Sequence, residues 1–318
     1  MIAYSQTEFL KLVGKFDTTI FAYMEELGTS EGDKTIVAEI FNRTEADTPD
    51  ISIVGSTAHT DMRQFKGMRN YEDLKELPPK IIKFTEFDKA EIFDRKTMDD
   101  NKVWEMKNRS GSLLRSYYRT CENFAAAMFN NISATTFTKD GETYDWTTCF
   151  DGSAVAADAH TSYTGYCQTL DNLTTDQLNG DNLETAFQTM GAFQDDAGNQ
   201  GNYFGDTVMV PLNLRKVAME LLGSEGKPTV TNNDYNIYDG AFKLIVWNRL
   251  TKGAAKTYYP WYLMDSIARK ENLYWFDRIM PEITDKRDFE SMTWKVGLYT
   301  RFGAGSWDWR WLQCAVPA

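Results

Sequence analysis

The spacing of apolar residues predicts four amphipathic helices. In each run, large apolar side chains recur three or four positions apart, as on one face of a helix. The runs cover residues 5–27, 98–130, 183–193 and 214–222. Ser5 and Glu8 form a capping-box pattern at the start of the first run. At 1.5 Å per residue the longest helix would span about 50 Å, and each apolar stripe must pack on this chain's core or on another subunit.

Short runs rich in β-branched and aromatic residues predict strands. These runs cover residues 36–41, 51–54, 81–93, 208–211, 242–247, 261–264, 273–276, 292–299 and 307–312. Trp307, Trp309 and Trp311 alternate along the last run. We expect them to share one buried sheet face, in preference to forming a stacking surface for sugars or bases. Residues 131–182 are polar and turn-rich, and residues 224–240 predict a loop. Together these elements predict an α+β fold.

A densely charged segment separates the first strands from the longest helix. Residues 62–80 alternate bulky and charged side chains, and Pro78 and Pro79 stop any helix there. The strands predicted before and after this segment indicate an extended hairpin with a charged tip. Such a hairpin has little core of its own, so we expect it to lie on another surface of complementary charge.

The chain is acidic, with a formal net charge of -12, which argues against a general nucleic-acid binder. Residues 140–206 contain twelve Asp and Glu residues and no Lys or Arg. This stretch indicates either a solvated acidic surface or a surface that must not adhere to DNA or to another polyanion.

The four cysteines are Cys121, Cys149, Cys167 and Cys314, and they form no CxxC pair and lack the spacing of a zinc site. We expect free thiols in a reducing cytosol, while a disulfide between some pair stays open. No segment reaches the length of a membrane span, and the N-terminus lacks the pattern of a signal peptide. We therefore expect no membrane association.

The sequence contains no catalytic or cofactor-binding motif. His59 and His160 are its only histidines, which is few for acid–base or metal chemistry. We therefore expect no catalytic residue, no cofactor and no metal site, and a protein that is not an enzyme.

Four short motifs follow one another along this order of elements. They are Ala159-His160-Thr161, Val208-Met209-Val210-Pro211, Trp261-Tyr262-Leu263-Met264 and Trp307-Asp308-Trp309-Arg310. In the order and spacing of its elements, the chain resembles the tailed-phage major capsid proteins of the Hong Kong 97-type fold, especially Mu-type prophage head subunits. Leu212 stands where that branch has a second proline, and residues 1–60 match by pattern only.

The resemblance implies a division of the chain into five segments. They are an N-terminal arm with the start of the peripheral domain (1–56), an extended hairpin or E-loop (57–95), a peripheral domain with a long spine helix (96–164), an axial domain (165–270) and the closing strands of the peripheral domain (271–318). On this mapping residues 224–240 form an axial loop that points at the centre of a five- or six-fold capsomer.

The resemblance also implies a function. We expect homo-pentamers and homo-hexamers that form the icosahedral shell of a virion, assembled in the host cytoplasm and enclosing double-stranded DNA without sequence-specific binding. A separate scaffolding protein and a portal are expected partners, and a decoration or cement protein is left open. The expected inter-subunit contact residues are Phe9, Phe16, Arg63, Lys66, Arg69, Tyr71, Lys75, Asn232, Asn233 and Tyr235.

Two other functions stay open. One is the shell of an encapsulin-like nanocompartment, which shares the fold, and the other is a hydrolase or sugar-binding protein that uses acidic and aromatic residues. Some capsids of this fold also join subunits by a Lys–Asn isopeptide bond. Lys66, Lys75 and Lys80 lie in the predicted hairpin, but no acceptor Asn or catalytic Glu matches a motif, so we expect no such bond.

Overall fold

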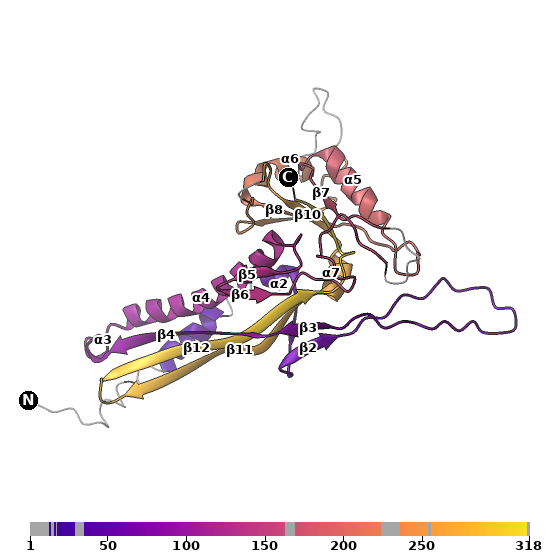
Figure 1. Ribbon diagram of the computed structural model, residues 1–318. Helices are drawn as coiled ribbons and strands as arrows, with labels where there is room; N and C mark the ends of the chain where they lie inside the picture. The colour runs from indigo at the N-terminus through magenta and orange to yellow at the C-terminus, as the bar shows by residue number, and fades with distance from the viewer. Residues whose placement is uncertain are drawn as a thin grey trace, which may run out of the picture.

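The computed structural model describes residues 13, 16, 18–28, 35–162, 169–223, 236–253 and 256–316. An elongated body built on a four-stranded sheet carries a more compact upper domain built on a five-stranded sheet (Figure 1). A long hairpin projects from the region where these two parts meet (Figure 1). Helices and strands are mixed along the chain, which confirms the predicted α+β class.

The elongated body consists of one long helix on a sheet of long strands. In spatial order the strands are β1 (Asn42–Glu45), β11 (Leu273–Asp288), β12 (Thr293–Ser306) and β4 (Thr85–Asp94). The helix α4 (Val103–Asn130) runs along the sheet and packs against β4 and β12 (Figure 1). Its buried residues include Leu113, Tyr117 and Phe124, which belong to the apolar stripe that the sequence predicted.

The described residues of the first predicted helix are helical and lie against α4. Met24 is buried in the chain's own core, and the Tyr118 hydroxyl of α4 donates a hydrogen bond to the Gly28 carbonyl oxygen (2.7 Å). Gly111 of α4 makes room for this helix, since a Cβ there would come within 3.2 Å of the Tyr23 ring. The described part of the apolar stripe is therefore covered by this chain, and the start of the predicted helix lies outside the described residues.

The upper domain is a mixed five-stranded sheet with a helix near each end. In spatial order its strands are β7 (Leu173–Thr174), β13 (Leu312–Ala315), β10 (Trp261–Met264), β8 (Thr207–Pro211) and β9 (Lys243–Trp247). Helix α5 (Gly180–Gly191) packs on β13, whereas α6 (Arg215–Leu222) packs on β8 and β9. Two shorter elements, η1 (Leu212–Leu214) and α7 (Ser266–Asn272), follow β8 and β10 along the chain.

One apolar core joins the two parts through the end of α4. The ring of Phe129, in the last turn of α4, makes edge-on contacts with four aromatic side chains. They are Phe41, Trp247, Tyr262 and Trp311, at ring-centroid distances of 5.6–6.3 Å. The Tyr262 hydroxyl also donates to the Phe129 carbonyl oxygen (3.0 Å). Buried aromatic contacts therefore hold the upper domain to the body.

Two short antiparallel pairs complete the fold. They are β2 (Asp50–Ile53) with β3 (Lys80–Lys83), and β5 (Phe137–Lys139) with β6 (Glu142–Tyr144). Strand β3 passes close over β12, where a Cβ at Gly303 would lie 2.9 Å from the Lys83 carbonyl oxygen. A Cβ at Gly305 would lie 2.6 Å from Ile82. Both glycines therefore allow a backbone approach that a larger residue would block.

Residues 36–41, predicted as a strand, mostly form a helix instead. The helix α2 (Ile36–Ile40) is followed closely by β1. Its two buried side chains lie three residues apart, and its Ile36 N–H donates to Oε1 of Glu122 on α4 (2.6 Å). The carboxylate at its start stabilises a helix, and a helix places both buried side chains on one face. These two effects outweigh the β propensity of this short run.

The predicted strand at residues 307–312 is also wrong, because only its last residue enters β13. Asp308 forms a turn there, with a carboxylate oxygen that accepts from the Trp309 N–H (2.7 Å). The three tryptophans therefore do not share one strand face. Trp309 and Trp311 are buried, whereas Trp307 is partly exposed.

Two predicted elements are divided in the structure. The helix predicted over residues 98–130 is interrupted after α3 (Arg95–Asp99), where Asn101 has a φ of 53° in the left-handed region. The strand predicted over residues 81–93 is divided into β3 and β4 at Phe84. The closing strands β11 and β12, by contrast, are much longer than the sequence predicted.

Candidate assembly surfaces

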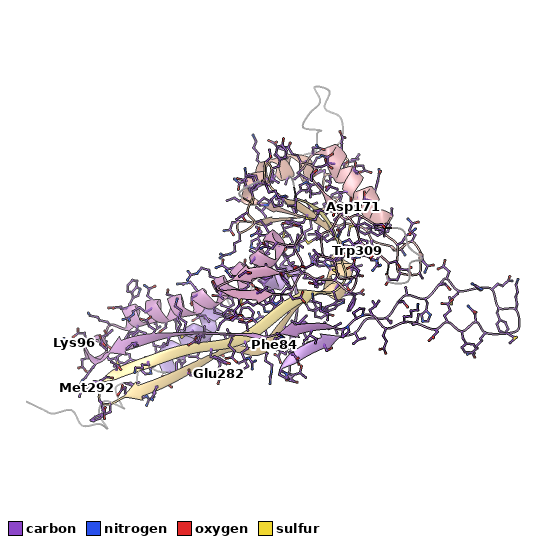
Figure 2. The ribbon with its side chains drawn as sticks, in the orientation of Figure 1. Phe84, Lys96, Asp171, Glu282, Met292 and Trp309 are labelled. Carbon is purple, nitrogen blue, oxygen red and sulfur yellow. The ribbon has the colours of Figure 1, made fainter. Side chains whose placement is uncertain are left out.

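Residues 55–77 form the long projecting hairpin, hereafter the extended hairpin (Figure 1). Its two sides are paired near the base, where the Thr57 N–H donates to the Lys75 carbonyl oxygen (3.0 Å). Residues 59–73 are all exposed. Figure 2 shows side chains projecting from both sides of the hairpin with no second layer packed on them. A two-stranded element without a core is marginally stable by itself, so a further surface is needed to hold it.

The tip of the extended hairpin, residues 61–72, presents apolar and basic side chains to solvent. Its exposed large apolar residues are Met62, Phe65, Met68 and Tyr71. Its basic residues are Arg63, Lys66 and Arg69. Met68 and Tyr71 are each 87% exposed, and the structure shows no ion pair for the three cations within the described residues. Exposed apolar side chains interspersed with unpaired cations are typical of a protein interaction surface.

The Lys80 side chain is buried at the base of the extended hairpin. Its side chain is 5% exposed, its Nζ donates to the Thr148 carbonyl oxygen, and Oδ1 of Asp145 lies 3.7 Å away. Burial lowers the pKa of Lys80 from its ordinary value of 10.5, although Asp145 opposes this effect. Lys80 therefore differs from Lys66 and Lys75, which are exposed.

Replacing Lys80 with methionine tests what burial of this charge costs, because it removes the charge while Asp145, whose side chain is 55% exposed, stays solvated. The folded state binds the Lys80 proton less tightly than the unfolded chain, so the cost of burying the charge is full at pH 7 and falls as the pH rises toward 10.5. We expect the free energy of unfolding of K80M to equal or exceed that of wild type at pH 7, with a difference that shrinks toward pH 10.5. Denaturant titrations at both pH values measure this difference, and a clearly less stable K80M at pH 7 contradicts it.

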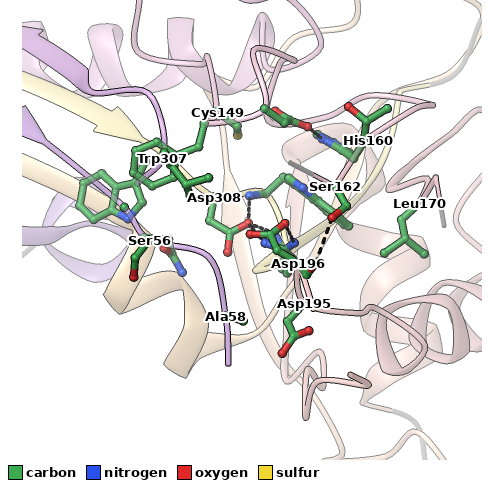
Figure 3. Close-up of a pocket in the computed structure, with 18 of the residues that line it drawn as sticks. Ser56, Ala58, Cys149, His160, Ser162, Leu170, Asp195, Asp196, Trp307 and Asp308 are labelled. Carbon is green, nitrogen blue, oxygen red and sulfur yellow. Dashed lines mark hydrogen bonds and ion pairs between the residues drawn. The ribbon is translucent and has the colours of Figure 1, made fainter. Parts of the chain in front are cut away.

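A cavity of about 270 Å³ lies between the base of the extended hairpin and the upper domain (Figure 3). Ser56 and Ala58 line it from the hairpin side. In its wall, Arg310 donates to carboxylate oxygens of Asp196 (3.1 Å) and Asp308 (3.0 Å). Burial alone would lower the pKa of Arg310, but these two carboxylates raise it above its ordinary value. Arg310 therefore offsets only part of the negative charge of this wall, which Asp151 and Asp195 also line.

His160 is buried in the wall of the same cavity. Its Nδ1 lies 2.7 Å from Oδ2 of Asp151, its Nε2 lies 3.1 Å from Oδ1 of Asn172, and its ring stacks on Trp309 with centroids 4.2 Å apart. Both ring nitrogens are thus engaged, so the geometry favours a structural role over proton transfer to a bound molecule. The polar network ties the Ala-His motif to the closing segment of the chain.

The described cysteines are buried free thiols, as the sequence predicted. They are Cys121, Cys149 and Cys314. Burial raises the pKa of Cys121 to about 12 and raises the pKa values of Cys149 and Cys314 well above the ordinary range. Because the thiolate is the reactive form, these side chains are poor nucleophiles. Cys167 lies outside the described residues.

Two kinds of feature are absent from the described part of the chain. It holds no cluster of three or more His, Cys, Asp or Glu side chains that could bind a metal ion. None of its helices combines the length and the apolar character that crossing a bilayer requires.

The ten predicted contact residues fall into three groups. Arg63, Lys66, Arg69, Tyr71 and Lys75 are all exposed on the extended hairpin. Phe9, Asn232, Asn233 and Tyr235 lie outside the described residues. Phe16 is 2% exposed in the chain's own core, so the surfaces proposed below do not include it.

Sequence reasoning missed several exposed apolar side chains. Met62, Phe65 and Met68 accompany the predicted cations at the hairpin tip, and Trp104 at the start of α4 is 80% exposed. A signal for the first three was present, because residues 62–80 are so densely charged that the large apolar residues among them have little core to occupy.

A comparison with protein families and solved structures decides which proteins this chain is related to. Residues 78–315, more than half of the chain, match the family model described as phage capsid protein. The chain belongs to the phage capsid protein family. The match begins just before β3 and covers α4, the strands β4, β11 and β12 of the body, and the upper domain. No curated protein matches the chain.

Solved capsids share the fold of this phage capsid protein over most of its length. The procapsid of bacteriophage JBD30 matches with a TM-score of 0.54 and 13% identity, over 97% of this chain and 76% of that one. Microbacterium phage Oxtober96 matches with a TM-score of 0.54 and 12% identity, over 89% and 90%. The capsid of a native GTA particle gives 0.51 and 10%, over 89% of both chains. The predicted Hong Kong 97-type fold is confirmed.

Family and fold together make this protein a structural component of a phage virion, a building block of its shell. Neither comparison favours a nanocompartment shell or a sugar-binding hydrolase.

Proposed function

We propose that this chain is the major capsid subunit, which assembles as homo-pentamers and homo-hexamers into an icosahedral shell around double-stranded DNA. The extended hairpin is the observation that carries the proposal, because its tip exposes four large apolar side chains and three cations without a core. In a shell of identical copies, the surface that covers this tip belongs to the next copy. The proposed role is mechanical and includes no enzymatic step.

The segments of the fold take separate mechanical roles in this proposal. The elongated body with α4 as its spine is the peripheral domain, and the five-stranded upper domain is the axial domain. Residues 224–240, most of which lie outside the described residues, are its proposed loop at the capsomer centre. The extended hairpin connects one copy to the next, and residues 1–56 combine an arm that reaches across neighbours with the start of the peripheral domain, to which β1 belongs. Repetition of modest contacts over many copies supports a stable shell.

Other partners follow from the same proposal. A net charge of -12 supports an inner surface that encloses DNA without sequence-specific binding. A separate scaffolding protein and a portal would direct assembly in the host cytoplasm. A similar capsid, that of bacteriophage JBD30, is decorated with minor capsid protein trimers, so a decoration protein belongs to the proposal as well.

Electron microscopy of the purified protein tests the proposed function. The chain is produced alone and together with the scaffolding candidate encoded beside it. We expect capsomer rings or closed particles in at least the second preparation. Monodisperse monomers in both preparations contradict the proposal. Closed particles that contain an enzyme cargo in place of DNA, from a locus without terminase and portal genes, would favour the nanocompartment.

Subunits of the mature particle are expected to carry no covalent cross-links. Lys80 is buried in its own subunit, which leaves Lys66 and Lys75 as the exposed lysines of the extended hairpin. Neither lysine has a matched acceptor Asn or catalytic Glu. Denaturing gels of purified particles should show a single subunit band, and a ladder of multimers would show that cross-links do form.

A further inference from the structure

The charge of the upper domain changes sign along the sequence. Residues 165–206 carry seven acidic residues and no Lys or Arg, whereas residues 207–256 carry seven Lys and Arg against four Asp and Glu. A solvated acidic surface does not account for this reversal. The sheet order shows where the two stretches lie, because β7 and β9 stand at opposite ends of the five-stranded sheet.

The acidic edge of the domain lies at the β7 end. It consists of Asp158, Asp171 and Asp176, which are all exposed. Asp171 and Asp176 flank β7, and Asp158, from the segment before the domain, follows Ala157, whose N–H donates to Asn172 next to β7 (2.9 Å). The structure shows no ion pair for these three carboxylates within the described residues.

The basic edge of the domain lies at the β9 end. It consists of Arg215, Lys216, Lys252 and Lys256, of which the first three are exposed and the last is half-buried. Arg215 and Lys216 begin α6, which packs on β9, and the two other lysines follow β9 along the chain. Of the four, only Lys216 has a carboxylate partner among the described residues, Glu220 at 3.6 Å. With strands about 4.8 Å apart, the two edges are separated by roughly 19 Å.

The basic edge also exposes apolar side chains. Leu212 and Met219 are 58% and 47% exposed beside it. Apolar groups among complementary charges are the composition of a protein–protein interface.

We propose that the acidic edge of one copy binds the basic edge of the next copy around each capsomer. The inference rests on the proposed ring assembly. In a closed ring every subunit presents one flank to the opposite flank of its neighbour, so a domain with two oppositely charged flanks is self-complementary head to tail. Like edges repel, which selects this orientation over a two-fold pairing of the same edges.

Charge reversal with rescue tests this contact. D158K/D171K/D176K reverses the charge of the acidic edge, R215E/K216E/K252E reverses that of the basic edge, and the sextuple variant restores complementarity with the original net charge. By sedimentation, we expect the fraction of protein in particles to fall at least about tenfold in each triple variant and to recover most of the way in the sextuple variant. The control D158K/D171K/D176K/K89E/K96E/K102E has the same net charge as the sextuple variant but keeps the basic edge, and it should stay unassembled.

As a control, the unfolding midpoint of each unassembled variant is measured to establish that the variant is folded. Folded triple variants that assemble like wild type, or a folded sextuple variant that fails as the triple variants do, overturn the inference and leave the proposed function standing. If DNA occupied the basic edge instead, D158K/D171K/D176K would assemble normally, which also overturns it. A wild-type protein that forms no particles overturns the proposed function itself.

Discussion

Deletion of the hairpin tip is expected to abolish shell formation while the subunit stays folded. The variant replaces residues 61–72 with Gly-Ser, which joins Thr60 to Asp73. Within its own chain it loses exposed contacts such as the hydrogen bond from the Thr60 N–H to Glu72 (3.0 Å), and it removes no core residue. We expect the free energy of unfolding to change by no more than about 0.5 kcal/mol. The yield of closed particles should fall at least about tenfold, because a contact made by every copy is lost.

Conservative changes in the same tip provide the matched control. R63K/K66R/R69K keeps the three positive charges and the apolar residues between them, so it should assemble close to the wild-type level. Sedimentation of assembled and free protein, with electron microscopy of the pelleted fraction, measures the yield for both variants. Normal particles from the deletion variant would show that the tip is dispensable and would remove the main support for its role between copies.

Truncation of Phe129 is expected to have the largest effect on stability. Its side chain is fully buried where the body meets the upper domain, and it touches four other aromatic rings. Replacing a buried phenylalanine with alanine leaves a cavity and costs about 3–5 kcal/mol. Since small proteins are stable by only about 5–15 kcal/mol, F129A should lose much of its folded population on warming and yield few particles.

The matched control for F129A lies on the same helix. Trp104 is a larger aromatic residue of α4 that is 80% exposed, so W104A should change the free energy of unfolding by about 0.5 kcal/mol or less. Denaturant unfolding of the unassembled subunits compares the two variants. Similar effects of F129A and W104A would show that the end of α4 does not hold the body and the upper domain together.

Elements with a complete apolar pattern of their own were predictable from the sequence. Most of α4, together with α5, α6, β8, β9 and β10, lies where its spacing or short apolar run placed it. The helix α2 was not predictable from its five residues, because a carboxylate of α4 lies at its start, and this contact joins residues 86 positions apart in the sequence. Long-range contacts of this kind determine whether a short segment that fits both a helix and a strand forms one or the other.

The length of the closing strands could not be predicted from the sequence, for a different reason. Beyond Asp277, β11 has lost β1 as a neighbour and keeps only β12, so its outer edge is free for polar residues and for Pro281. The pairing with β12 is irregular between Ile279 and Glu282, on either side of this proline. From the sequence alone, a proline within a polar stretch predicts the end of a strand. Here Pro281 lies at a bulge on an open sheet edge, so the strand continues past it.

The candidate surfaces were only partly predictable. The charged hairpin was recognisable because so densely charged a segment has little core of its own, and its five predicted contact residues are all exposed. The two charged edges of the upper domain needed the sheet order, because nothing in the sequence shows that β7 and β9 lie at opposite ends. The network around His160 likewise joins residues from separate segments.

A three-dimensional reconstruction of the assembled particle by cryo-electron microscopy tests most directly whether the extended hairpin joins one shell subunit to the next. Residues 61–72 of every copy should lie on a neighbouring copy, with Phe65, Met68 and Tyr71 buried in that contact and Arg63, Lys66 or Arg69 near its carboxylates. A closed shell in which these residues extend into solvent, or fold back on their own subunit, would contradict the proposed role of the hairpin.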